Sequence, residues 1–567
     1  ASLLPSMVEA SLKALPVPKP MRWGDRDYAF VRPAHWLVML LGDAVVEGSV
    51  LGLSADRFSR GHRFHHPKPV WIAHPGDYVD ALRAAHVLAD PDERKARIRA
   101  AVEAAGAGGG GRARIPEALL DEVSNITEWP VAIACSFGPE FLRVPQEALV
   151  TTMEANQKFF PVFDPHGRLT EHFVGVANIE SRDPGEIRRG YERVIRPRFA
   201  DAAFFFDEDL KSPLAEQRAA LERVTYQQKL GTLWDKTVRV AELARQIANR
   251  TGSDAALATR AASLSRCDLM SRMVGEFPEL QGTMGRYYAT EQGEPAEVAN
   301  AIDEFYAPRH AGDAIAHGGL SRVLAIADKA DTLAGAFAIG QKPTGNKDPF
   351  SLRRTALGLA RTLIEGGVEL NLVGLLREAV DPIAPDRSEA VANELYEFVL
   401  ERLRGYYADK GIAGDVFDAV AAVRPASLVD FDRRLRAIVE FAQLPAAASL
   451  AAANKRIGNL LRQAREKGIA PAARIDAAQF EPGPESALGE RVAALQQAQV
   501  ALLHQHRYVD AMRELASLRE PVDAFFDQVM VMVEDTARRD NRLALLAALR
   551  AQFLAIADIS LLQAPAA

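Results

Sequence analysis

The sequence predicts a mainly α-helical, multidomain protein with one α+β unit near its N-terminal end. Three observations lead to this fold class. The chain has 567 residues, whereas a single hydrophobic core stops growing near about 250 to 300 residues. Aromatic residues make up only 7%, while alanine and leucine run through long stretches, as is typical of helices. After residue 200, apolar residues recur at spacings of three and four, so we expect few strands there.

Net charge and cysteine content exclude several function classes. The chain carries 68 lysines and arginines against 75 aspartates and glutamates, a formal net charge of −7. Any contact with nucleic acid must therefore be local. The two cysteines, Cys135 and Cys267, exclude a disulfide scaffold and a four-cysteine zinc site, and they favour a reducing, cytoplasmic location. No apolar stretch reaches the roughly 18 residues of a membrane span.

The N-terminal 200 residues are predicted to mix helices and strands. Short β-rich runs broken by Gly, Pro and Asp occupy residues 23–80, and strand-like composition returns at 129–178. Between them, residues 91–105 read as a charged helix and the glycine-rich 106–111 as a flexible stretch. The glycine run is not followed by Gly-Lys-Ser/Thr, so it is not a P-loop. We expect one α+β domain over 1–200.

Proline and glycine clusters divide the helical remainder of the chain. We expect a helical domain at 201–345, a helical connecting region at 346–445 and a C-terminal helical bundle at 446–567.

Two clusters of basic residues are candidates for contact with phosphates. Residues 454–469 hold five cations and one anion, a local charge of +4. On a helix, Lys455, Asn459 and Arg462 would share one face that can follow a phosphate backbone, although a merely solvated face is the alternative. The candidates in this segment are Lys455, Arg456, Asn459, Arg462 and Arg465. The second cluster lies at 188–198 and contributes Arg188, Arg189 and Arg193.

Two further patterns resemble metal sites only in part. The histidines of GHRFHHP at 61–67 lack a third or fourth ligand in a recognisable pattern, so we interpret this segment as a polar loop. The helical segments 261–279 and 325–333 resemble the HD domain, whose metal-binding form uses a His, a His-Asp pair and a distant Asp. Here the pair reads Cys267-Asp268, Lys236 or Thr237 replaces the first His, and Asp328 or Asp331 is the distant Asp. We expect a degenerate HD fold that binds no metal.

The chain shows no self-contained ATP site by motif. HIGH and KMSKS, the nucleotide-binding signatures of class I aminoacyl-tRNA synthetases, do not occur. Long strings nevertheless resemble one family over essentially the whole chain: the beta subunit of the bacterial heterotetrameric glycyl-tRNA synthetase. They include TTMEANQKFFPVF from 151, IRPRFADAAFFFDEDL from 195, GEFPELQGTMGRYYA from 275 and PTGNKDPFSLRR from 343. Members of that family usually have a further N-terminal segment, so the resemblance predicts a chain truncated at its start.

The resemblance implies a division of labour between subunits. In that family the alpha subunit activates glycine with ATP and Mg²⁺, and the beta subunit binds tRNA(Gly) within an alpha2beta2 tetramer in the cytoplasm. The resemblance further implies a B3/B4-like domain at 1–200, an HD-like domain at 201–345 and a DALR-like anticodon-binding domain at 446–567. We expect no catalytic residue and no cofactor on this chain. Tyr508 is a candidate for stacking on an anticodon base.

Two alternative functions remain open at this point. The B3/B4 resemblance suggests a tRNA-editing deacylase, although no positioned nucleophile or zinc triad is visible. The HD-like layout suggests a degenerate HD-type phosphohydrolase, although its histidines are missing.

Overall fold

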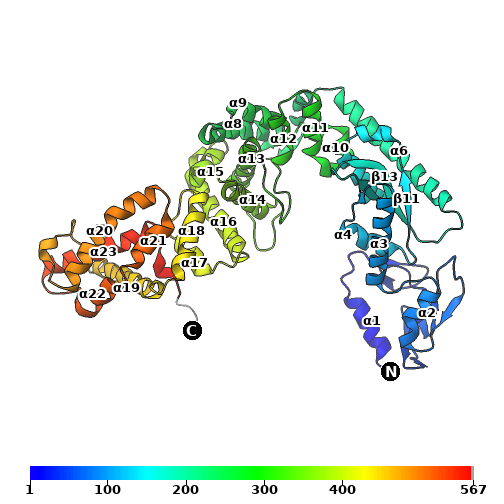
Figure 1. The fold of residues 1–567 in the computed structure, drawn as a ribbon, viewed down its shortest axis with the longest axis horizontal. Coiled ribbons are helices and arrows are strands. Elements are labelled where there is room, and N and C mark those ends of the chain that lie inside the picture. Colours follow the sequence, from blue (N-terminus) through cyan, green and yellow to red (C-terminus); the bar gives the residue numbers. More distant parts are fainter. Residues whose placement is uncertain (564–567) are drawn as a thin grey trace. The chain divides into compact units, whose positions relative to one another are not determined.

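The computed structural model describes residues 1–563. The chain forms two compact units, the first made of residues 1–211 with 275–280 and the second of 212–274 with the chain from 281 onward (Figure 1). Each unit is described by itself below.

The N-terminal part of the first unit consists of small sheets and two short helices. Its pairings are β1-β2, β3-β7-β6, β4-β5 and β8-β9. Left-handed glycines such as Gly42 and Gly52 allow the tight turns between these strands. The elements are α1 (Leu4–Ala14), β1 (Met21–Arg22), β2 (Ala29–Phe30), β3 (Leu37–Val38), β4 (Leu40–Leu41), β5 (Ala44–Val45), β6 (Ser49–Val50), β7 (Leu53–Asp56), β8 (Phe58–Arg60), β9 (Pro69–Trp71) and α2 (Tyr78–Ala84).

The rest of the first unit is built on a four-stranded antiparallel sheet in the order β10-β12-β13-β11. Helices α3 and α4 cover an apolar core that includes Ile98, Val102 and Phe160. Asp90 caps α3 by accepting hydrogen bonds from two backbone N–H groups of its first turn. The elements are α3 (Pro91–Gly108), β10 (Arg112–Ala113), α4 (Glu117–Ile126), β11 (Val131–Ser136), α5 (Gln146–Thr151), β12 (Phe160–Phe163), β13 (Leu169–Ala177) and α6 (Pro184–Leu210).

The second unit is helical apart from one small hairpin, β14 (Thr225–Gln227) with β15 (Gly231–Thr232). Its central helix is α13 (Gly319–Ala338), which packs against α8, α12, α14 and α15. The other helices before the C-terminal bundle are α7 (Arg218–Leu221), α8 (Leu233–Thr251), α9 (Ala255–Leu264), α11 (Thr283–Glu291), α12 (Ala296–Glu304), α14 (Leu352–Glu365), α15 (Leu372–Val380), α16 (Ser388–Ala408), α17 (Gly414–Ala421) and α18 (Leu428–Ala442). The short α10 (Arg272–Glu276) crosses the sequence border between the units.

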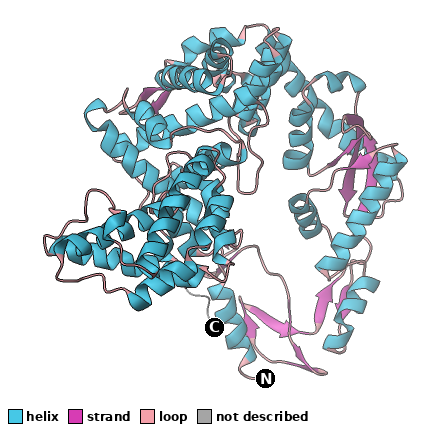
Figure 2. Ribbon diagram, turned by 60° about the vertical axis from the view of Figure 1, so that its left-hand side comes forward, coloured by secondary structure: helices cyan, strands magenta, loops and turns pink. Residues whose placement is uncertain are grey.

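A bundle of five helices ends the described part of the second unit, and Figure 2 shows its helical character. The helices are α19 (Ala447–Glu466), α20 (Pro484–His504), α21 (Tyr508–Ala516), α22 (Arg519–Gln528) and α23 (Thr536–Leu554). Among residues 1–563, no single helix has the length and apolar composition to cross a membrane. The bent pair α18 and α19 meets that test only when its two helices are taken together.

The mainly helical, multidomain fold is confirmed, and two details differ from expectation. The helix predicted over 91–105 continues through the first glycines to Gly108. A Cβ atom at Gly106 would lie 2.9 Å from the backbone N of Ala113, and one at Gly111 would lie 2.6 Å from the carbonyl oxygen of Phe163. These glycines permit close packing of α3 on the sheet. The predicted border at residue 200 falls inside α6, which continues to Leu210.

Candidate RNA-binding surface

The predicted basic segment forms most of α19, and its polar side chains face outward. Lys455, Arg456, Asn459, Arg462 and Arg465 are all exposed, whereas Ile457 on the opposite face is buried. We call these five exposed residues the α19 basic face. The alanine-rich sequence lets this helix pack closely on α22 and α23 while its long polar side chains extend into solvent.

Most cations of the α19 basic face are not neutralised by the chain itself. Within residues 1–563, no carboxylate lies within 4.0 Å of the charged nitrogens of Lys455, Arg462 or Arg465. Arg462 donates a hydrogen bond to Oδ1 of Asn459 at 3.0 Å. Arg456 differs, because its guanidinium lies 4.4 Å from the ring centre of Phe526 on α22. The face therefore offers free positive charge to an anionic partner.

Tyr508, the candidate for base stacking, is buried in this structure. Its side chain is only 4% exposed, and its hydroxyl donates to Oδ1 of Asp430 at 2.5 Å. Arg434 lies over its ring, 4.7 Å from the centre. Burial and then the hydrogen bond to Asp430 raise the pKa of Tyr508 to about 12. The residue therefore ties α21 to α18 in this structure, and its role in stacking on an anticodon base stays a prediction.

The second basic cluster lies on α6 in the first unit. Arg188, Arg189, Arg193, Arg196 and Arg198 are exposed. Arg189 forms an ion pair with Glu186, whereas the other four have no carboxylate partner within residues 1–563. Arg188 and Arg193 are therefore available to an anionic partner, whereas Arg189 is already paired with Glu186.

The histidines of residues 61–67 are held in internal contacts. The imidazole Nε2 of His62 lies 2.6 Å from the carbonyl oxygen of Asn178. The Nε2 atom of His65 accepts from the backbone N of Glu180 at 3.0 Å, and its ring stacks on His86. Burial, with His62 and His86, lowers the pKa of His65. Within residues 1–563, no group of three or more His, Cys, Asp or Glu side chains is arranged to hold a metal ion.

A buried ion-pair network occupies the positions that the sequence analysis compared with an HD domain. Nζ of Lys236 lies 2.9 Å from Asp331 and 3.2 Å from Asp328. Arg239 pairs with Asp331 at 2.7 Å, and Arg266 pairs with Asp328. Burial opposes ionisation of Asp328, yet Arg266 and Lys236 lower its pKa to about 2. Both carboxylates are therefore already balanced by cations of the chain, which is unsuitable for a metal-dependent phosphohydrolase.

Cys267 and Asp268, which follow Arg266 in the sequence, are fully buried and make other contacts than this ion-pair network. Oδ2 of Asp268 accepts from the backbone N of Gly282 at 2.5 Å and of Gly285 at 3.1 Å, and Oδ1 has no hydrogen-bond partner among residues 1–563. Burial raises the pKa of Asp268 to about 6 and that of Cys267 to about 12. A thiol in this state is a poor nucleophile and a poor metal ligand.

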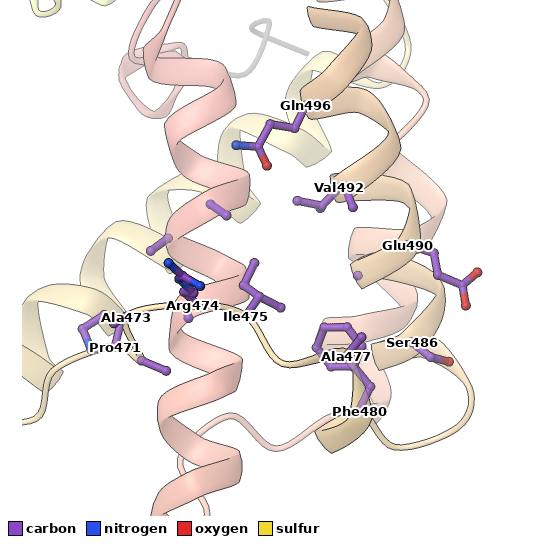
Figure 3. Close-up of a pocket in the computed structure, with 16 residues that line it drawn as sticks. Pro471, Ala473, Arg474, Ile475, Ala477, Phe480, Ser486, Glu490, Val492 and Gln496 are labelled. Carbon is purple, nitrogen blue, oxygen red and sulfur yellow. The ribbon is translucent and has the colours of Figure 1, made fainter. Parts of the chain in front are cut away.

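The structure also contains a pocket that the sequence did not indicate. It has a volume of about 710 Å³ and lies between α20, α23 and the segment 471–480. Figure 3 shows Gln496 at one end and Phe480 at the other, with Ile475 between them. Gly489 forms part of its wall, where a Cβ atom would lie 2.3 Å from the ring of Phe480. In the sequence, the alanine-rich stretch of α23 was the available signal for this pocket, but the same pattern is equally typical of ordinary helix packing.

Comparisons with known proteins identify the class of protein. Residues 450–564 match the DALR anticodon binding domain, so α19 to α23 form a module of the kind found in aminoacyl-tRNA synthetases. Residues 1–422 match the family described as glycyl-tRNA synthetase beta subunit. The chain belongs to this family.

Proteins that are similar over nearly the whole chain agree with that assignment. A glycine--tRNA ligase beta subunit of Xanthomonas campestris pv. campestris (strain 8004) is 57% identical over 553 residues, covering 96% of this chain and 79% of the relative. Proteins of the same name from Xylella fastidiosa (strain 9a5c) and Pseudomonas fluorescens (strain SBW25) are 51% and 49% identical. They cover 98% and 99% of this chain, and 81% and 82% of their own length.

Proposed function

We propose that this chain binds tRNA(Gly) and positions it for ATP-dependent glycylation by a separate alpha subunit, in an alpha2beta2 tetramer in the cytoplasm. The observation that carries the proposal is the α19 basic face, whose unpaired cations lie inside the region that matches an anticodon-binding domain. Holding the tRNA would convert a bimolecular encounter at the alpha subunit into an oriented one.

The chemistry belongs to the alpha subunit in this proposal. ATP and Mg²⁺ act there, because this chain carries no nucleotide-binding signature. The beta chain binds no cofactor of its own, and its contribution is affinity and orientation. Lysine and arginine supply salt-dependent attraction to backbone phosphates.

The test is a tRNA-binding titration at several salt concentrations with the double variant Lys455→Ala/Arg462→Ala. If each residue contacts one phosphate, the magnitude of the salt slope falls by about 1.4 to 1.8 and affinity at 0.1 M salt falls about 25- to 60-fold. Thermal stability changes little, because exposed charges contribute less than about 1 kcal/mol each.

The matched control is Arg513→Ala/Arg538→Ala, which removes two exposed arginines that are already paired with Glu440 and Glu481. This variant retains tRNA affinity. Unchanged affinity and salt slope in the Lys455/Arg462 variant would refute a role for the α19 basic face and direct attention to Arg188 and Arg193 on α6.

A further inference from the structure

A cationic pocket lies in the second unit, outside the region that matches the anticodon-binding domain. It has a volume of about 740 Å³ and is formed by α14, α16, the residues that follow α16 and the turn at 308–312. We call it the α14–α16 pocket. Its cations are Arg353, Arg354, Arg361, Arg402 and Lys410, and its carboxylates are Glu365, Glu401 and Asp409.

Internal pairing accounts for the carboxylates Glu365 and Glu401. Arg361 binds Glu365 through Nε at 2.7 Å and Nη2 at 3.2 Å. Arg402 pairs with Glu401, and its Nε atom is buried without a hydrogen-bond partner. After these two pairs, three cations remain against the single carboxylate of Asp409. The residues that line the pocket therefore carry a net positive charge.

Arg354 is the least engaged of the remaining cations. It is exposed at the pocket, and within residues 1–563 its guanidinium has no hydrogen-bond or ion-pair partner. Arg353 beside it donates to the carbonyl oxygen of Gly345 at 2.5 Å. Lys410 lies over the ring of Tyr406, 4.0 Å from its centre. Arg353 and Arg354 belong to α14 and Lys410 to the turn after α16, and all three line the pocket.

The backbone that carries Arg354 is held in place. Thr344 and Lys347 exchange two backbone hydrogen bonds of 3.1 and 2.9 Å, which closes a tight turn ahead of α14. The carboxylate of Asp348 then accepts from the backbone N of Leu352 and of Arg353 at 2.8 and 2.9 Å. These hydrogen bonds fix the backbone at the start of α14, so binding of a ligand needs to order only the side chain of Arg354.

We propose that the α14–α16 pocket binds a phosphate group of the tRNA backbone, which adds a second contact to the proposed function and rests on it. Guanidinium groups match phosphate geometry, and the cations without a carboxylate partner come from two segments rather than converging on one buried point. That distribution suits a phosphate of a polymer that passes across the opening. A free nucleotide or inorganic phosphate offers the same chemistry and is the competing source.

The experiment compares Arg354→Ala with Arg223→Ala in the full chain. Arg223 is an exposed arginine outside the pocket that also has no side-chain partner within residues 1–563. Loss of one phosphate contact lowers the magnitude of the tRNA salt slope by about 0.7 to 0.9 and weakens affinity about five- to eightfold at 0.1 M salt. We expect this for Arg354→Ala and no change for Arg223→Ala, with equal melting temperatures for both variants and the parent.

A second arm separates the sources of phosphate, and a third separates this inference from the proposed function. Titration with inorganic phosphate and with AMP is expected to show no saturable binding, and binding of either one combined with unchanged tRNA affinity in Arg354→Ala would overturn the assignment to RNA. If Lys455→Ala/Arg462→Ala weakens tRNA binding and Arg354→Ala does not, the pocket proposal fails alone. If the parent chain does not bind tRNA, both proposals fail.

Discussion

Replacement of Asp268 by asparagine isolates the energetic cost of one buried carboxylate. Asp268 is completely buried, and only its Oδ2 atom accepts hydrogen bonds, from the backbone N–H groups of Gly282 and Gly285. Asparagine has nearly the same shape and keeps one oxygen for these two donors. Its amide group replaces the Oδ1 atom that lacks a partner. The substitution removes the charge without creating a cavity, but it leaves two buried amide N–H donors where protonated aspartate has one O–H, and this cost does not vary with pH.

The magnitude follows from the pKa. Burial raises the pKa of Asp268 to about 6, roughly two units above that of an unfolded aspartate, which corresponds to about 3 kcal/mol. Because the folded state binds this proton more tightly, the free energy of unfolding falls as pH rises through the window from about 4 to about 6, and the loss persists above it. Asparagine has no such loss. We expect the stability of Asp268→Asn relative to the parent to rise by up to about 3 kcal/mol between pH 4 and pH 7.5.

Urea denaturation of the parent and the variant at pH 4 and pH 7.5 measures this difference. The control is Asp381→Asn at an exposed carboxylate, where the two pH values are expected to give the same small change. A stability difference between variant and parent that is the same at pH 4 and pH 7.5 would refute the argument that desolvation dominates at Asp268.

The remaining predictions concern the buried network and the buried tyrosine. Lys236→Met leaves Asp331 and Asp328 without one of their cations, so we expect a loss of about 3 to 5 kcal/mol in denaturant unfolding; a loss below about 1 kcal/mol would show that Arg239 and Arg266 suffice. Tyr508→Phe removes the hydrogen bond to Asp430, and we expect about 1 to 3 kcal/mol of destabilisation with tRNA affinity unchanged. A selective fall in tRNA affinity without a fall in stability would restore Tyr508 as a contact residue.

The local sequence pattern was sufficient to predict the exposure of side chains whose environment depends only on their own helix. The exposure of Lys455, Arg462 and Arg465 follows from helical spacing against the buried Ile457, so the α19 basic face could be predicted before the structure. Tyr508 could not be placed in this way. Its burial depends on Asp430 and Arg434, more than 70 positions earlier in the chain, and no periodicity within α21 reports that contact.

The HD positions show a related limit. The sequence indicated that ligand histidines were missing, but it left open which residue stands in for the first one and which aspartate is engaged. The structure shows Lys236 in contact with both Asp328 and Asp331. The contributions of Arg239 and Arg266 were not foreseen, because both arginines read as ordinary polar positions of a helix and a turn. Distant ion pairs of this kind depend on tertiary packing.

The pattern of paired and unpaired cations explains how an acidic chain can bind a polyanion. The formal net charge of −7 opposes approach of RNA at long range, but the Debye length at physiological ionic strength is only about 8 Å. Beyond that distance the acidic surface exerts little force, and local charge decides binding. Within residues 1–563, many arginines, such as Arg404 and Arg424, are neutralised by carboxylates of the chain, whereas Lys455, Arg462 and Arg354 are not. A few unpaired side chains would then carry most of the salt-dependent affinity, so removing them should cost far more than removing the same number of paired arginines.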